Sequence, residues 1–154
     1  MASYRIEHYL TADEQHDPYL KWLSRLRDRA AKIAVIRRVN RIEQGNFEAT
    51  MRSRGHDDAM AELYRSDPAL ALDVINGVLE DGDQAELLTV LRQLAQAFGG
   101  VQAVAEQAQL NPTQLYRTLS PKGNPALSSL TAILKAMGLR LAVRPIDSST
   151  PAHC

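Results

Sequence analysis

Cysteine, aromatic residues and long apolar runs are all scarce in this sequence. The one cysteine, Cys154, stands last and has no second cysteine with which to form an internal disulfide bond. Aromatic residues make up only 5% of the 154 residues although 45% are hydrophobic, so aliphatic side chains must build the core. No run of about 18 apolar residues is present, and MASYRIEHYL lacks the apolar stretch of a signal peptide. These absences predict a cytoplasmic protein that does not bind a membrane.

Motifs for catalysis and for metal or cofactor binding are also lacking. The four histidines are scattered along the chain, and Cys154 has no partner at metal-ligand spacing. There is no glycine-rich phosphate-binding loop, and no motif joins Ser, His and acidic residues into a triad. His56 precedes Asp57 and Asp58, but the acidic first turn of a helix explains this run better than a catalytic site. We expect no enzymatic activity, no catalytic residue, no metal and no cofactor.

Charge is balanced overall but unevenly spread. Residues 1–50 carry nine basic and seven acidic side chains, residues 51–98 carry four and nine, and residues 99–154 carry five and two. The positive C-terminal third has the sign that contact with phosphates requires. The acidic middle should lie away from nucleic acid or face a basic partner.

Residues 101–120, VQAVAEQAQLNPTQLYRTLS, have the pattern of two short helices joined by a tight turn. Apolar residues form an inner face on both helices, and Asn111 followed by Pro112 is a strong start for the second. This pattern predicts a helix-turn-helix, whose second helix lies in the DNA major groove. An ordinary helical hairpin in a core is the alternative. Gln109 favours that alternative, because glycine often holds this turn position and Gln should resist a left-handed backbone.

The outward residues of the second helix can hydrogen-bond to phosphates or base edges. Arg117 is the best candidate for reading a base, since a guanidinium group suits guanine O6 and N7. Tyr116 either contacts DNA or packs beneath the helix. Lys122, in the following SPKGNP loop, could reach a phosphate while Gly123 lets the backbone come close, or the loop only links two helices. The predicted DNA-binding residues are Asn111, Thr113, Gln114, Tyr116, Arg117 and Lys122.

The N-terminal part predicts a short strand over residues 3–9 and then a helical hairpin. Asp17 and Pro18 should start the first helix, which carries Leu20, Leu23 and Leu26. A second helix should direct its isoleucines, up to Ile42, inward. Residues 20–41 hold eight basic residues and one acid, which is more typical of a solvated or partner-facing surface than of a nucleic-acid site.

Further helices are predicted after Asp67-Pro68, between Asp83 and Phe98, and from Asn124-Pro125 to Gly138. Their apolar stripes include Leu79 and Leu127 as core positions. Residues 139–143 alternate as a short strand, and residues 147–154 form a disordered tail. The fold class is therefore mainly α, a lambda-repressor-like helical domain with short strands at both ends.

The opening residues resemble the HigB/RelE-type toxins. The match covers residues 3–50. Its features are a helix that starts at Asp-Pro, an Arg-rich second helix and the ending GNF. The residues that carry it are Pro18, Trp22, Leu23, Leu26, Asp28, Gly45, Asn46 and Phe47. In that family an RNA-cleaving β-sheet follows. Here MRSRGHDDAMAEL follows instead, which is not strand-like, so the resemblance implies a truncated toxin without its active site.

From residue 51 to 146 the resemblance changes to the HigA-like antitoxins of the probable addiction module antidote group. HDD at 56–58, Asp67-Pro68, LEDGD at 79–83, LYRTLSPKGNP and LTAILKAMGLRLAV carry it. The resemblance implies three parts after the toxin-like segment 1–50: an acidic helical segment 51–98, a helix-turn-helix domain 99–146, and the tail.

Residues and resemblance together predict a DNA-binding antitoxin that represses its own operon. It would bind double-stranded operator DNA as a homodimer, and a HigB/RelE-type toxin is a possible second partner. Dimerisation could use the helices before the helix-turn-helix or the strand 139–143. That strand could equally pair with residues 3–9 within one chain. The alternative function is a protein-binding module that neutralises a basic toxin through residues 51–98 and does not read DNA.

Overall fold

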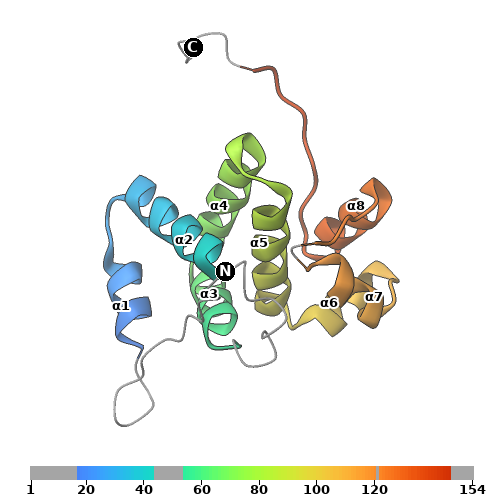
Figure 1. Cartoon of the computed structure of the whole chain (residues 1–154), viewed down its shortest axis with the longest axis horizontal. Helices are drawn as coiled ribbons and strands as arrows, with labels where there is room; N and C mark the ends of the chain where they lie inside the picture. Colours follow the sequence, from blue (N-terminus) through green and yellow to red (C-terminus); the bar gives the residue numbers. More distant parts are fainter. Residues whose placement is uncertain (1–16, 44–53, 121, 147–154) are drawn as a thin grey trace.

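The computed structural model describes residues 17–43, 54–120 and 122–146. These residues form eight α-helices: α1 (Pro18–Arg25), α2 (Arg29–Glu43), α3 (Arg54–Ser66), α4 (Pro68–Asp81), α5 (Gln84–Ala97), α6 (Val101–Ala108), α7 (Pro112–Thr118) and α8 (Leu127–Ala136). Figure 1 shows α1–α4 on one side of α5 and α6–α8 on the other. The mainly α-helical class is confirmed.

Local capping explains where several helices begin. The carboxylate of Asp17 accepts a hydrogen bond from Leu20 N at 3.0 Å, and that of Asp67 accepts one from Leu70 N at 3.1 Å. Each aspartate is followed by a proline at the first helical position, where the missing N–H costs nothing. Asp83 caps α5 in the same way, through Glu86 N at 2.8 Å. All three helix starts are confirmed.

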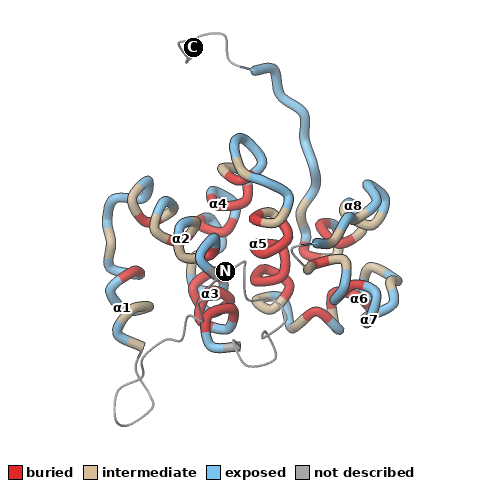
Figure 2. Tube along the Cα trace, in the orientation of Figure 1, coloured by how far each residue is buried: buried red, intermediate tan, exposed pale blue. Residues whose placement is uncertain are grey.

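The body of the molecule, α1–α5, is built around α5. Helix α3 packs along α5, α4 packs on both, and α2 crosses α4 and α5. Leu23 from α1 and Ile36 from α2 are fully buried in the same cluster as Leu88 and Leu91 of α5. Figure 2 shows that most of α3 and α5 is buried, with every residue of α5 from Leu88 to Ala95 buried, whereas most of α1 is exposed. Residues 17–43 are therefore packed onto the rest of the chain through α2 and through the apolar side of α1, where Tyr19 and Leu20 join Leu23 against the core.

A buried polar cluster joins α2, α3 and α5. Asn40 and Gln93 exchange two amide hydrogen bonds, of 3.3 and 2.9 Å, and both side chains are fully buried. His56 Nε2 lies 2.9 Å from Asn40 Oδ1. Because that oxygen can only accept, we assign the proton to Nε2 of His56. Gln93 also donates to Asp57, whose carboxylate forms a buried ion pair with Arg92 at 2.8 Å.

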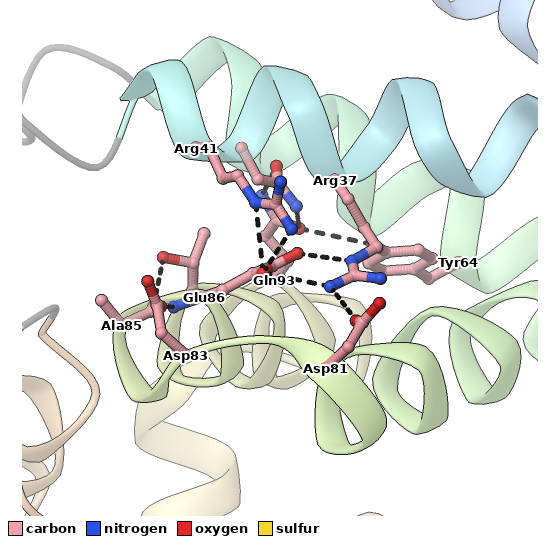
Figure 3. Close-up of polar contacts among 10 residues, drawn as sticks. Arg37, Arg41, Tyr64, Asp81, Asp83, Ala85, Glu86 and Gln93 are labelled. Atoms are coloured by element: carbon pink, nitrogen blue, oxygen red, sulfur yellow. Dashed lines mark hydrogen bonds and ion pairs between the residues drawn. The ribbon is translucent and has the colours of Figure 1, made fainter. Parts of the chain in front are cut away.

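Arginines of α2 bind acidic residues of α4 and α5 (Figure 3). The buried carboxylate of Glu86 accepts from Arg37 Nε at 2.6 Å and from Arg41 at 3.2 Å. Arg37 also donates to Asp81 at 2.7 Å, and the bond to Glu86 raises the pKa of its guanidinium group. Glu86 lies in the first turn of α5, and its carboxylate links the start of that helix to α2.

At the other end of α2, Arg29 completes this row of charge pairs. It forms ion pairs with Asp73 and, at 3.5 Å, with Asp67. Arg29 and Arg37 therefore neutralise acids of α4. Arg37 and Arg41 neutralise Glu86 of α5. The outward residues of α2, such as Arg38, stay exposed.

Several core and strand predictions are wrong or unconfirmed. Ile42, Leu79 and Leu127 are exposed, and each lies in the first or last turn of its helix, where fewer neighbours cover a side chain. The last helix starts at Leu127, two residues after Pro125. Among the described residues there is no β-strand: residues 139–143 pair with no other segment, and the strand expected at 3–9 lies outside the described residues, as does the tail 147–154.

Candidate nucleic-acid interface

Helices α6 and α7 are joined by a turn whose backbone is left-handed at a residue other than glycine. Gln109 has φ 58° and ψ 39°, the only positive φ of a non-glycine residue among those described. Leu110 N then donates to Ala105 O at 2.8 Å, which closes α6 and redirects the chain. Gln109 was expected to resist this conformation. The chain adopts it, at a cost of about 1–2 kcal/mol, and makes the tight turn of a helix-turn-helix.

Helix α7 begins as its sequence predicts. Asn111 Oδ1 accepts a hydrogen bond from Gln114 N at 3.2 Å, and Pro112 occupies the first helical position. Leu115 and Leu119 are buried in the same apolar cluster as Val104 and Ala105, and α7 packs on α6. One face of α7 is thus held by apolar contacts, which orients the opposite face to solvent.

The opposite face of α7 carries the predicted DNA-binding residues. Thr113, Gln114, Tyr116 and Arg117 are all exposed. Tyr116 is 53% exposed, so it is not packed beneath the helix. None of the four makes a side-chain hydrogen bond or ion pair with another described residue. Asn111, by contrast, caps the helix with its side-chain oxygen. Only the rest of its exposed side-chain amide remains for a further contact.

The loop after α7 is folded tightly against the C-terminal end of that helix. A Cβ atom on Gly123 would lie 1.9 Å from Thr118 O, so no other residue fits without moving the loop. Gly123 N donates to Ser120 O at 2.8 Å, and Gln84 of α5 donates to Gly123 O at 2.6 Å. The close backbone approach expected of Gly123 is therefore made to α7. Lys122 is exposed beside this fixed loop.

Positive charge is concentrated around this unit. Between residues 99 and 146 the only acid is Glu106, while five basic residues are present and all are exposed: Arg117, Lys122, Lys135, Arg140 and Arg144. None of them forms an ion pair within the described residues. An exposed, uncompensated positive surface is the electrostatic requirement for contact with a phosphate backbone.

Sequence reasoning missed the buried polar cluster of Asn40, His56, Asp57, Arg92 and Gln93. Within the described part of the chain no group of His, Cys, Asp or Glu residues could hold a metal ion, and no helix there has the length and apolar character to cross a membrane. The cluster is enclosed and its groups bind one another, so its geometry fits packing between helices. One signal was available, since His56-Asp57 and Arg92-Gln93 are polar residues on otherwise apolar helix faces.

These features define a helical protein with a helix-turn-helix, α6 and α7, in its C-terminal part. The chain belongs to the family described as Probable addiction module antidote protein, whose profile matches residues 57–145, more than half of the chain. No curated protein and no solved structure gives a significant match.

The family assignment makes this protein an antitoxin of a toxin–antitoxin system, with a cognate toxin as its partner. The match begins within the first turn of α3 and runs through α8 to residue 145, which confirms the antidote resemblance. Helices α1 and α2 lie outside it.

Proposed function

We propose that this antitoxin binds operator DNA as a dimer through α7 and represses transcription of its toxin–antitoxin operon. The observation that carries the proposal is the outward face of α7, where Thr113, Gln114 and Arg117 are exposed and unbound on a helix held rigidly from behind. Arg117 would contact a base edge, while Thr113 and Gln114 contact bases or phosphates. Tyr116, the exposed amide edge of Asn111, and Lys122 would contact the backbone of the same half-site. Two recognition helices would lie about 34 Å apart, one turn of DNA.

A toxin-neutralising module that does not read DNA is the second candidate. It requires the acidic residues of the middle segment to meet a basic toxin. In the structure five of the nine acids of residues 51–98 bind arginines within the chain: Asp67, Asp73, Asp81 and Glu86 bind arginines of α2, and Asp57 binds Arg92. More than half of the acidic charges that this function needs are therefore neutralised, which favours the DNA-binding proposal.

Fluorescence anisotropy with the promoter DNA upstream of the gene tests the proposal. The full chain is titrated into a labelled promoter duplex and into a scrambled duplex of equal length, at two salt concentrations. We expect tighter binding to the promoter and a marked loss of affinity at the higher salt, because phosphate contacts release counterions. Arg117→Ala should weaken promoter binding by about 1–3 kcal/mol.

The matched control is Arg38→Ala, which removes the same charge from an exposed position on α2, on the far side of the body from α7 (Figure 1). It should leave promoter affinity almost unchanged. Equal, weak binding to both duplexes, or equal losses in the two variants, would contradict the proposal and favour the second candidate.

The origin of residues 3–50 as a truncated HigB/RelE-type toxin is a separate proposal. What supports it is that the family match begins at residue 57, after α2, and that α3 follows where a toxin would have its sheet. In this proposal α1 and α2 have no toxin activity and serve only to pack against α3, α4 and α5. Expression of the full chain should then leave cell growth and mRNA intact, and growth arrest would contradict this view.

A further inference from the structure

The residues that follow α8 form an extended arm, defined here as residues 139–146. Gly138, with φ 74°, ends the last helix, and Leu139 N donates to Leu134 O at 2.8 Å. Beyond that bond, residues 140–146 make no backbone hydrogen bond to any other described residue. Figure 1 shows the arm stretched away from α8 and α5. The N–H and C=O groups of residues 140–144 are thus available to pair with another strand.

The arm has two faces of different character. In extended backbone, successive side chains point to opposite sides, so Leu139, Leu141 and Val143 share one face. Arg140 and Arg144 lie on the other. Val143, on the apolar face, is 99% exposed although it is a large apolar residue. In a strand with one apolar and one basic face, the apolar face is expected to pack against protein and the basic face to remain in water.

A groove runs beside the base of the arm. It has a volume of about 570 Å³ and is lined by Thr131, Lys135, Gly138, Leu139, Arg140 and Leu141. Helix α8 forms one wall and the arm forms the other. The groove is therefore a place where a second strand could pair with the arm and cover Leu141.

We propose that residues 139–143 pair in antiparallel register with the same residues of a second copy of this chain, and that this two-stranded ribbon is the dimer interface. The inference deepens the proposed operator binding, on which the need for a dimer rests. A second copy fits because the contact is self-complementary: each chain supplies one arm and one groove, as a twofold axis requires.

Charge selects the register. A twofold axis through Leu141 places Arg140 opposite Ala142 of the second copy and brings Leu139 opposite its Val143. An axis through Ala142 would instead place Arg140 opposite Arg144 of the second copy, and like charges directly opposite one another destabilise a strand pair. The Leu141 register also gathers the apolar side chains of both arms on one face of the ribbon. An isolated two-stranded ribbon is marginal in water, so packing of this face in the two grooves is essential.

Sedimentation velocity on the full chain tests the interface. Wild type should sediment as a dimer at micromolar concentration. The double variant Leu141→Asp/Val143→Asp should sediment as a monomer with an unchanged circular dichroism spectrum, since both residues are exposed in the single chain. Leu79→Asp is the matched control, because Leu79 is an exposed apolar residue of α4. The control should remain dimeric. A monomeric wild type, or a dimer that survives the arm substitutions, would overturn the proposal.

Cross-linking tests the register. In a Cys154→Ser background, Leu141→Cys should form a disulfide-linked dimer on mild oxidation, because residues opposite each other in a strand pair have Cβ atoms about 4.5–5.5 Å apart. Arg144→Cys should cross-link far more slowly, since its two copies would lie roughly 20 Å apart along the ribbon. Equal rates for the two cysteines would overturn the register.

The two proposals fail differently. If the arm inference is wrong but operator binding is right, the arm variants keep their dimeric state and full promoter affinity. If operator binding is wrong, wild type is a dimer that does not distinguish promoter from scrambled DNA. If both are right, the monomeric arm variant loses affinity for the full operator but binds a duplex with one half-site as wild type does.

Discussion

The body, α1–α5, and the helix-turn-helix unit, α6–α8, use their polar side chains in opposite ways. In the body, Glu86 and Gln93 are buried and each binds two or more protein groups. In the helix-turn-helix unit, Gln114 and Arg117 are exposed and bind no other described side chain. Burying a polar group is tolerable only when it is paired, whereas an exposed one is solvated at little cost. The polar residues of the body thus fix the positions of its helices, whereas those on the exposed face of α7 remain available to another molecule.

Breaking the buried ion pair should produce the largest loss of stability. Arg92→Met leaves Asp57 charged and buried without its partner, so we expect the free energy of unfolding to fall by about 3–5 kcal/mol. Urea denaturation followed by circular dichroism measures this. Arg117→Met, the same substitution on exposed α7, should change stability by less than about 0.5 kcal/mol. If the two variants lose similar amounts of unfolding free energy, polar residues in the body and in the helix-turn-helix unit do not differ in the way stated above.

The next largest effect tests whether α2 belongs to the body. Ile36 is fully buried, so Ile36→Ala should reduce the free energy of unfolding by about 2–4 kcal/mol through lost burial and a cavity. Ile42 lies near the end of the same helix and is 48% exposed. Ile42→Ala should therefore lower the free energy of unfolding by less than about 1 kcal/mol. Both values come from the same urea experiment. If Ile36→Ala also proved nearly neutral, α1 and α2 would be a loosely attached appendage.

Alkaline pH should weaken the body selectively. Burial, together with the charge of Asp57, raises the pKa of Tyr64 above its ordinary value of 10.0. The neutral phenol is therefore favoured in the folded chain, so this contribution is complete below pH 10 and is lost as pH rises toward the folded-state pKa. The loss from this group should reach about 1.4 kcal/mol near pH 11. Comparing urea midpoints of wild type and Tyr64→Phe from pH 8 to 11 isolates it, because the exposed Tyr116 stays in both. A difference that does not change with pH would contradict the assignment.

The helix starts could be predicted because capping is local. Asp17, Asp67 and Asn111 each bind a backbone N–H three residues ahead, and a proline beside each one strengthens the signal. The face of α7 could be predicted for a similar reason, since the spacing of Leu115 and Leu119 fixes which side is buried. These features need no knowledge of distant parts of the chain.

The rest depends on distant partners. Asn40 meets Gln93, 53 residues away, so nothing near Asn40 in the sequence indicates its burial. Leu79 and Leu127 continue the apolar stripes of their helices, but a stripe does not tell where the neighbouring helix ends. The alternation of residues 139–143 predicted a strand, but a strand exists only with a partner, and among the described residues the single chain supplies none.

The smallest predicted effect concerns the turn that positions α7. Gln109→Gly should stabilise the protein by about 0.5–1 kcal/mol, because glycine adopts φ 58° without the steric cost that Gln carries, less the extra freedom glycine has when unfolded. Gln107→Gly is the matched control in the same helix: its backbone is helical, so glycine should destabilise by about 0.5–1 kcal/mol there. Thermal or urea unfolding of both variants gives the two signs. Promoter affinity of Gln109→Gly should match wild type, because the turn keeps its shape. If both substitutions destabilise, the Gln109 side chain must contribute contacts that outweigh its backbone strain, and the turn would then depend on glutamine itself and not only on its left-handed geometry.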